Sequence, residues 1–263
     1  MTYQPVVPLG GVAGWRFLQR TYDTQIQSFE ASNVNAREKA YFLENISKVQ
    51  TAEELVSDRR LLQVALGAFG LEADLNNRFF VQKILSDGTK ANDALANRLA
   101  DSRYRAFSEA FGFGPGEVRK TGLITNMEKV AEDNVVARFE AAVGESDDSM
   151  RIALYAQHEL PEIANKEGSE RRKWYDLMGM PPLRSMMETA LGLSSSIAQL
   201  DLDRQVAIFQ DRLSRVTGSD EMSQFSDPEA VAKLTDTYMA RNQIAQIQAT
   251  ISPAQTALIL LGG

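Results

Sequence analysis

The stretch Ala68-Phe69-Gly70-Leu71 recurs twice in altered form, as Ala110-Phe111-Gly112-Phe113 and as Ala190-Leu191-Gly192-Leu193. Each copy places a glycine between two large apolar residues, and we call the motif the glycine box. Glycine adopts the left-handed conformation at low cost, and the apolar residue after it can fold back onto the last helical turn. Each glycine box therefore predicts the C-terminus of a helix.

Apolar residues recur every three or four positions through most of the chain, beginning with a predicted helix from about Gly14 to Ala31. After the first glycine box, Leu71, Leu75 and Phe79 are expected to form the inner face of one helix that continues through Ile84. No alternating strand pattern exceeds about four residues. The sequence predicts an all-α fold, an irregular multi-helix bundle built from degenerate internal helical repeats.

Short polar side chains mark the expected helix starts. Thr51 and Thr125 are each followed three positions later by a glutamate, which is the spacing of a capping box. Further N-caps are expected at Asp58, Asp101-Ser102, Asp201 and Ser226-Asp227.

Residues 1–263 are predicted to form a single all-helical domain with a possible hinge at residues 144–149, between two repeat-related halves. That segment reads Gly-Glu-Ser-Asp-Asp-Ser and interrupts the helical pattern. The boxes at Gly70, Gly112 and Gly192 are unequally spaced, so we interpret them as an eroded internal duplication and not as a regular solenoid.

Composition excludes several classes of function. A chain of 263 residues with 44% hydrophobic and 24% charged residues can form a sizeable core. Its net charge of −7 disfavours nucleic acid as the main partner, and the absence of cysteine excludes thiolate chemistry. No stretch approaches the ~20 apolar residues of a membrane span, and Met1 to Gly14 lacks the charged start of a signal peptide. We expect a cytoplasmic protein without membrane insertion.

His158 is the single histidine of the chain, so every motif that needs two histidines is excluded, including paired-histidine zinc and di-iron sites. Its neighbours Glu159 and Glu162 make a catalytic pair conceivable. A surface position or a helix C-cap is the simpler interpretation.

Two glycine-containing segments have features of phosphate loops. Residues 112–116 read Gly-Phe-Gly-Pro-Gly, but they follow a helix, and Pro115 removes a backbone donor. Residues 88–90, Gly-Thr-Lys, have the end of a P-loop without its first glycine. We interpret both segments as turns.

Acidic and hydroxyl clusters also have simple explanations. Glu145, Asp147 and Asp148 lack the alternate oxygens and central glycine of a calcium loop, so a solvated linker is expected. Asp201 and Asp203 fit a helix N-terminus better than a metal site. Residues 194–196, three serines, have no histidine nearby to activate a nucleophile.

The run Arg171-Arg172-Lys173-Trp174-Tyr175 is the most concentrated basic and aromatic stretch of the chain. On a surface it could bind a protein partner, RNA or a membrane. On a helix, Trp174 shares a face with Leu177, whereas Arg171 and Lys173 point elsewhere, as in an ordinary amphipathic helix. We therefore expect no catalytic, cofactor-binding or metal-binding residue.

A set of short motifs follows a characteristic order along the chain. They are residues 41–49, 54–72, 96–101, 104–113, 182–184, 189–193, 200–205 and 225–228. In this order they resemble an uncharacterised alphaproteobacterial family known as domain of unknown function 1217. The chain differs from that family around residues 155–161, where Ala156 and His158 stand in place of an expected Phe and Arg.

The resemblance implies an all-helical protein whose relatives are often encoded beside flagellar genes and sometimes labelled flagellar, with no established site residues to transfer. We expect a non-enzymatic protein that binds protein partners, flagellar components among them, in flagellar assembly or regulation. The apolar ends Val6-Val7-Pro8-Leu9 and 258–261 favour this hypothesis. Two alternatives stay open: a small-molecule binder or hydrolase with a site built from distant carboxylates and arginines, and an exported rod or axial component.

Overall fold

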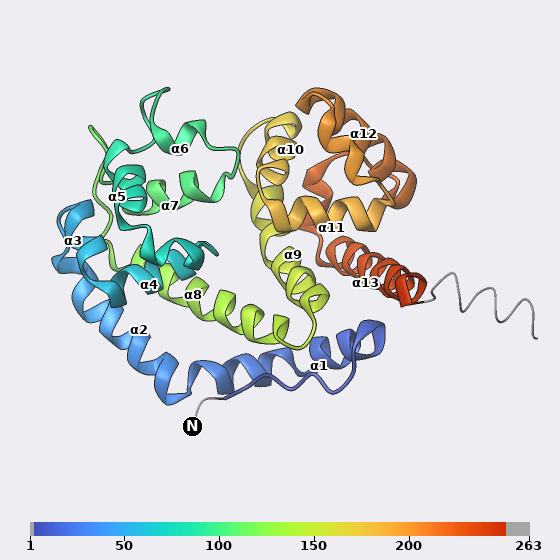
Figure 1. The fold of residues 1–263 in the computed structure, drawn as a ribbon, viewed down its shortest axis with the longest axis horizontal. Coiled ribbons are helices and arrows are strands. Elements are labelled where there is room, and N and C mark those ends of the chain that lie inside the picture. The colour runs from blue at the N-terminus through green and yellow to red at the C-terminus, as the bar shows by residue number, and fades with distance from the viewer. Residues whose placement is uncertain (1–2, 251–263) are drawn as a thin grey trace, which may run out of the picture. The chain divides into compact units, whose positions relative to one another are not determined.

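The computed structural model describes residues 3–250, and this part of the chain contains thirteen α-helices, four short 3-10 helices and no strand (Figure 1). The predicted all-α class is confirmed. The chain divides into two compact units. Unit 1 is formed mainly by Arg20–Glu145, and unit 2 by Val7–Gln19, Ser146–Met178 and the residues from Pro182 onward.

Unit 1 contains the second part of the first helix and seven further α-helices. Its core joins residues of α2, α3, α4, α5, α7 and α8 in one cluster. Phe107 is fully buried in this cluster and packs edge-on against Phe69 and Phe111, at centroid distances of 5.6 and 5.4 Å. The helices are α1 (Gly11–Glu30), α2 (Asn33–Asn45), α3 (Ala52–Ser57), α4 (Arg59–Gly67), α5 (Arg78–Asp87), α6 (Leu95–Arg98), α7 (Arg103–Phe111) and α8 (Ile124–Gly144), with the 3-10 helices η1 (Ile46–Lys48) and η2 (Glu72–Asn76).

Unit 2 contains the start of α1 and five further α-helices. Helix α9 contacts α13, α10 and the short segment η4. Both tryptophans are fully buried here: Trp15 donates to Asp236 Oδ1 (3.0 Å), and Trp174 donates to the carbonyl of Asp220 (3.0 Å). The helices are α9 (Asp148–Asn165), α10 (Glu170–Met178), α11 (Pro181–Leu191), α12 (Leu202–Thr217) and α13 (Pro228–Thr250), with η3 (Ser195–Gln199) and η4 (Met222–Ser226).

All three glycine boxes follow a helix and place glycine at positive φ, with values of 65° at Gly70, 64° at Gly112 and 65° at Gly192. This prediction is confirmed. The boxes nevertheless use two hydrogen-bond patterns. At Gly70 and Gly192 the following residue donates to the carbonyl five positions back, as in a Schellman motif. Gly112 instead donates its own N–H to Ser108, as in the simpler left-handed cap.

Most predicted N-caps are confirmed. Thr51 Oγ1 accepts from the Glu54 N–H (3.2 Å), and Asp58 accepts from the N–H groups of Arg60 and Leu61 (2.9 and 3.1 Å). The capping box predicted at Thr125 is wrong: α8 begins at Ile124 behind Leu123, which supplies no capping side chain. The remaining predicted caps are made by Asp101, Asp201 and Asp227.

The single helix expected from Leu71 to Ile84 is also wrong. The chain forms η2 and then restarts as α5 at Arg78, so the predicted inner face is not continuous. Leu71 and Ile84 are buried, but Phe79 is 83% exposed. The break at Asn77 shifts the helical register, and Phe80 then contacts Tyr104 at 5.4 Å between ring centroids.

The division into units falls between Glu145 and Ser146, inside the segment 144–149. Asp147 caps α9 by accepting from the Ser149 N–H (3.0 Å). The single domain and the hinge at this position stay predictions. The apolar run at 258–261 lies outside the described residues.

Candidate functional site

The two segments that resembled phosphate loops lie against each other in unit 1. Thr89 donates its N–H and its hydroxyl to Glu117 Oε1, at 2.6 and 2.9 Å. Gly114 donates its N–H to the other oxygen of the same carboxylate at 3.3 Å. The donors that an external anion would require are therefore directed to a carboxylate of the chain itself, and the turn interpretation agrees with this geometry.

The backbones of these segments cross closely at two glycines. A Cβ atom added at Gly88 would lie 2.6 Å from Gly114 Cα, nearer than side chains approach in real structures. Lys90 Nζ also donates to the carbonyl of Gly116. The sequence shows each glycine separately, but nothing in it pairs residues 28 positions apart.

The loop after Gly112 is fixed at its far end by a second set of polar contacts. Arg119 donates to the carbonyl of Val49 (3.0 Å) and to Thr121 Oγ1 (2.8 Å). The buried Thr121 hydroxyl donates to the same Val49 carbonyl at 2.8 Å. The loop therefore holds its shape through contacts with residues 88–90, which follow α5, and with the connection before α3.

An open groove of about 460 Å³ lies between this loop, α3 and α5, and we call it the α3–α5 groove. Most of its lining side chains are polar, with carboxylates at Glu53 and Glu117 and a guanidinium at Arg119. The lining residues are Gln50, Thr51, Ala52, Glu53, Gln82, Ser86, Gly112, Phe113, Gly114, Glu117 and Arg119.

Phe79 lies on the same face of α5 as the lining residues Gln82 and Ser86, because positions three and seven apart share a helix face. Its 83% exposure is the largest among the exposed large apolar side chains of residues 3–250. The apolar spacing of the sequence predicted Phe79 on the inner face of a helix. Only the helix restart at Arg78 shows that it is a surface residue.

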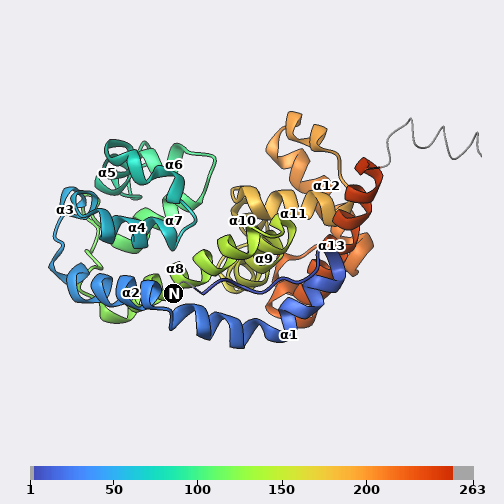
Figure 2. The same ribbon diagram turned by 60° about the horizontal axis from the view of Figure 1, so that its bottom comes forward.

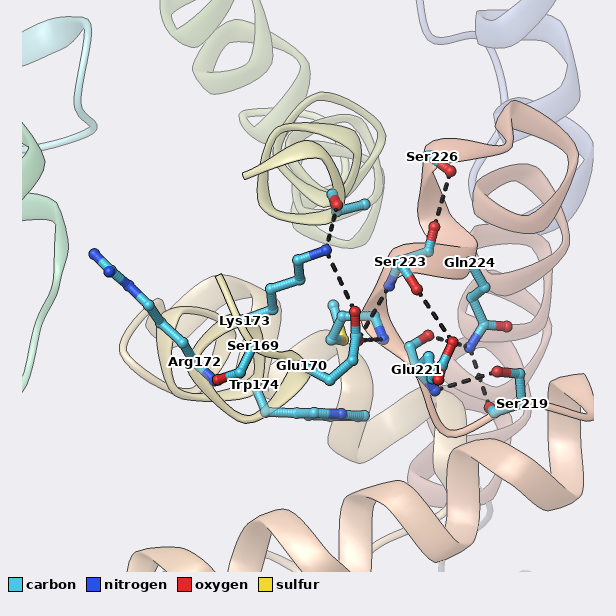
Figure 3. Close-up of polar contacts among 12 residues, drawn as sticks. Ser169, Glu170, Arg172, Lys173, Trp174, Ser219, Glu221, Ser223, Gln224 and Ser226 are labelled. Carbon is cyan, nitrogen blue, oxygen red and sulfur yellow. Dashed lines mark hydrogen bonds and ion pairs between the residues drawn. The ribbon is translucent and has the colours of Figure 1, made fainter. Parts of the chain in front are cut away.

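Three side chains of the run 171–175 contact other segments of unit 2, although Arg171 itself is exposed. Lys173 is buried, and its ammonium donates to the Ala164 carbonyl (2.7 Å) and lies 3.3 Å from Glu170 Oε1 (Figure 3). Tyr175 donates to Asp203 of α12, and Arg171 lies 2.8 Å from the same carboxylate. These contacts connect α10 to its neighbours. Trp174 and Leu177 are buried as the amphipathic interpretation expects, whereas the burial of Lys173 departs from it.

Glu170 connects α10 to η4 within unit 2. Its Oε2 accepts from the N–H groups of Met222 (2.6 Å) and Ser223 (3.3 Å), at the start of η4 (Figure 3). Burial alone would raise the pKa of Glu170, but these two hydrogen bonds and Lys173 outweigh it and lower the pKa. The carboxylate is therefore stabilised in its charged form, as suits a structural contact.

The remaining candidate site residues make only local contacts in the structure. His158 lies within α9, half-buried and 3.5 Å from Glu159 Oε1, and α9 continues through Pro161 to Asn165, so the C-cap interpretation is wrong. Asp201 caps α12. Ser194 caps η3 by accepting from the Ser196 N–H (3.3 Å). Among the described residues, no group of three or more acidic or histidine side chains gathers to hold a metal ion.

The structure thus defines a class: an all-α protein of two helical units, with an open polar groove in unit 1. The chain belongs to the family described as protein of unknown function (DUF1217), whose model matches residues 68–231. The resemblance noted from the sequence is confirmed for this part, and its motifs before Ala68 lie outside the match.

A crystal structure of an Agrobacterium tumefaciens protein, solved as a structural-genomics target, is similar to this chain with a TM-score of 0.73. The alignment covers 92% of this chain and 99% of that protein at 22% identity, which supports the fold alone. Comparison with curated proteins gives no significant match. Within residues 3–250, none of the helices combines the length and apolarity that crossing a membrane requires.

Proposed function

We propose that this protein is a non-enzymatic interaction protein that binds a segment of a protein partner in the α3–α5 groove. The observation that carries the proposal is Phe79, an aromatic side chain 83% exposed on the α5 face that lines the groove. Exposed aromatic residues beside a groove are typical anchors of protein interfaces, where a few such residues contribute most of the binding energy.

The polar lining suits a peptide partner better than an apolar ligand. Gln50, Gln82 and Ser86 offer donors and acceptors to a peptide backbone, and Glu53 adds a negative charge. We expect the partner segment to carry an apolar residue that packs against Phe79 and a basic residue that pairs with Glu53. The groove is open, which allows an extended segment to enter from the side.

The flagellar role rests on the family resemblance, because relatives are often encoded beside flagellar genes. We propose that the partner is a flagellar component and that the protein acts in flagellar assembly or regulation from the cytoplasm. Export as a rod or axial component is the alternative role. Neither role requires an enzyme.

The hydrolase alternative requires carboxyl groups that hold a proton near neutral pH, with raised pKa values, in an enclosed cavity. The pKa values of Asp58, Glu170 and Asp203 are all lowered, which is the opposite of what this alternative requires of its carboxyl groups. Each of them accepts hydrogen bonds within the chain. No specific observation favours this alternative.

The test is affinity purification from a motile strain with the wild-type protein, Phe79→Ser and a matched control, Val34→Ser. Val34 is an exposed apolar residue of α2, outside the groove lining. We expect wild type and the control to recover the same flagellar protein and Phe79→Ser to lose it, with motility falling in parallel. Equal recovery by Phe79→Ser would refute the groove, and recovery of no flagellar component with normal motility in a deletion strain would refute the role.

A further inference from the structure

The last helix of unit 2 is buried in its first half and exposed in its second. Val231, Leu234, Tyr238 and Met239 of α13 have relative exposures of 3% or less. From Arg241 to Ala249, every residue is exposed except the half-buried Asn242. The exposed part of α13 thus carries side chains that the core of unit 2 does not cover.

Two isoleucines occupy one face of this exposed part. Ile244 is 55% exposed and Ile247 is 51% exposed, and their spacing of three places them side by side on the helix. An apolar stripe of this kind is typical of a helix that packs against another helix.

The start of the chain adds to the same surface. The Val12 N–H donates to Gln243 Oε1 (3.2 Å), and α1 begins beside α13 at this point (Figure 2). Gly11 has a φ of 64°, and a Cβ there would lie 2.8 Å from the same oxygen. We call Gln243, Ile244, Ile247 and Gln248 the α13 terminal surface.

The α13 terminal surface can pack against a second copy of itself, because it is uncharged and its amides can pair. No residue from Asn242 to Thr250 is charged, although the chain carries a net charge of −7. In a two-fold interface each residue near the axis meets its own copy, so charged residues there repel. Glutamine amides both donate and accept hydrogen bonds, so two copies of Gln243 or Gln248 can pair with each other.

We propose that the α13 terminal surface binds the same surface of a second copy of this chain, forming a two-fold dimer in which Ile244 and Ile247 pack across the axis. The exposed helix of about ten residues is about 15 Å long. A standard stable interface uses roughly 20–30 residues from each side, so the dimer is weak and depends on protein concentration. The proposal is independent of the α3–α5 groove.

The test is sedimentation analysis of the purified full-length protein from low to high micromolar concentration. We compare wild type, the double variant Ile244→Glu/Ile247→Glu and the control Gln246→Glu/Ala249→Glu, which adds the same charge to the opposite helix face. We expect wild type and control to shift from monomer to dimer with rising concentration, whereas the isoleucine variant stays monomeric with unchanged helical circular dichroism.

Three outcomes would overturn the proposal: a wild type that is monomeric throughout, an isoleucine variant that still dimerises, or a control that fails to dimerise while folded. A truncation after Thr250 identifies a competing occupant, because dimerisation only of the truncated chain would mean that residues 251–263 cover the surface in the intact protein. Phe79→Ser should dimerise as wild type does, which separates this test from that of the groove.

Discussion

Gly70 and Gly112 end two helices of unit 1 at almost the same φ, 65° and 64°, yet their surroundings differ. A Cβ at Gly70 would have the flexible end of Arg103 as its neighbour, at 3.1 Å. A Cβ at Gly112 would overlap the Val118 carbonyl oxygen and lie 3.0 Å from its carbonyl carbon. The two boxes therefore share a local conformation, but only the second one also accommodates a backbone crossing.

The largest effect is expected for Gly112→Ala. The methyl group adds left-handed strain of about 1 kcal/mol and collides with the Val118 carbonyl, in a loop that hydrogen bonds of Glu117 and Arg119 hold in place. The loss of stability should therefore reach about 3 kcal/mol. Urea unfolding of the variant against wild type measures it. A loss equal to that of Gly70→Ala would show that the loop moves aside freely.

Gly70→Ala should cost about 1 kcal/mol, because only the left-handed conformation penalises the methyl group there. Gly192→Ala should cost a similar amount, since the overlapping atom belongs to the mobile end of Arg241. The same urea titration applies to both. A cost near zero at either position would mean that the cap relaxes into another conformation.

The contact of Glu117 with Thr89 and Gly114 offers a direct test of why Gly112 differs. Glu117→Ala should free the loop, so the cost of Gly112→Ala should fall by about 1 kcal/mol in a double-mutant cycle. Gly70→Ala combined with Glu117→Ala serves as the control and should be additive within about 0.5 kcal/mol. Equal coupling in both cycles would indicate a general loss of structure in unit 1.

The smallest effect concerns Glu170, which accepts two backbone N–H groups in unit 2 much as Glu117 does in unit 1. Its pKa is lower in the folded state, so its contribution is present above the ordinary value of 4.5 and is lost as pH falls through the lowered value. We expect Glu170→Gln to lower the urea midpoint at pH 7 and to flatten its decline between about pH 5 and about pH 3.

Tryptophan fluorescence reports this change in unit 2, because both tryptophans of the chain are buried there. Glu167→Gln, which removes the same charge from an exposed glutamate of unit 2, is a control for general charge effects. If the urea midpoints of wild type and Glu170→Gln fell in parallel as pH decreased, the lowered pKa of Glu170 would not contribute to stability.

Features that depend on a few neighbouring residues were predicted correctly. The three box glycines and the caps at Thr51 and Asp58 follow from the side chains within one helical turn. The failures at Thr125 and Phe79 have a common cause. In both places the local pattern was compatible with two registers, and packing of the rest of unit 1 selected the other one.

The candidate sites were less predictable than the fold. The sequence correctly indicated turns at residues 88–90 and 112–116, but not that Glu117 joins them. It indicated an amphipathic helix at Arg171–Tyr175, but not the burial of Lys173 against Ala164. These contacts connect distant positions, and no spacing rule in a single chain specifies them.

The sequence by itself determined that the chain is all-helical, where glycine ends its helices and to which family it belongs, because these properties depend on local backbone preferences and on the order of motifs. Only the tertiary structure decided that Gly88 crosses Gly114, that Phe79 faces outward and that Ile244 and Ile247 are exposed. The physical reason is that burial and close backbone approach result from the packing of distant segments, which local preferences do not determine.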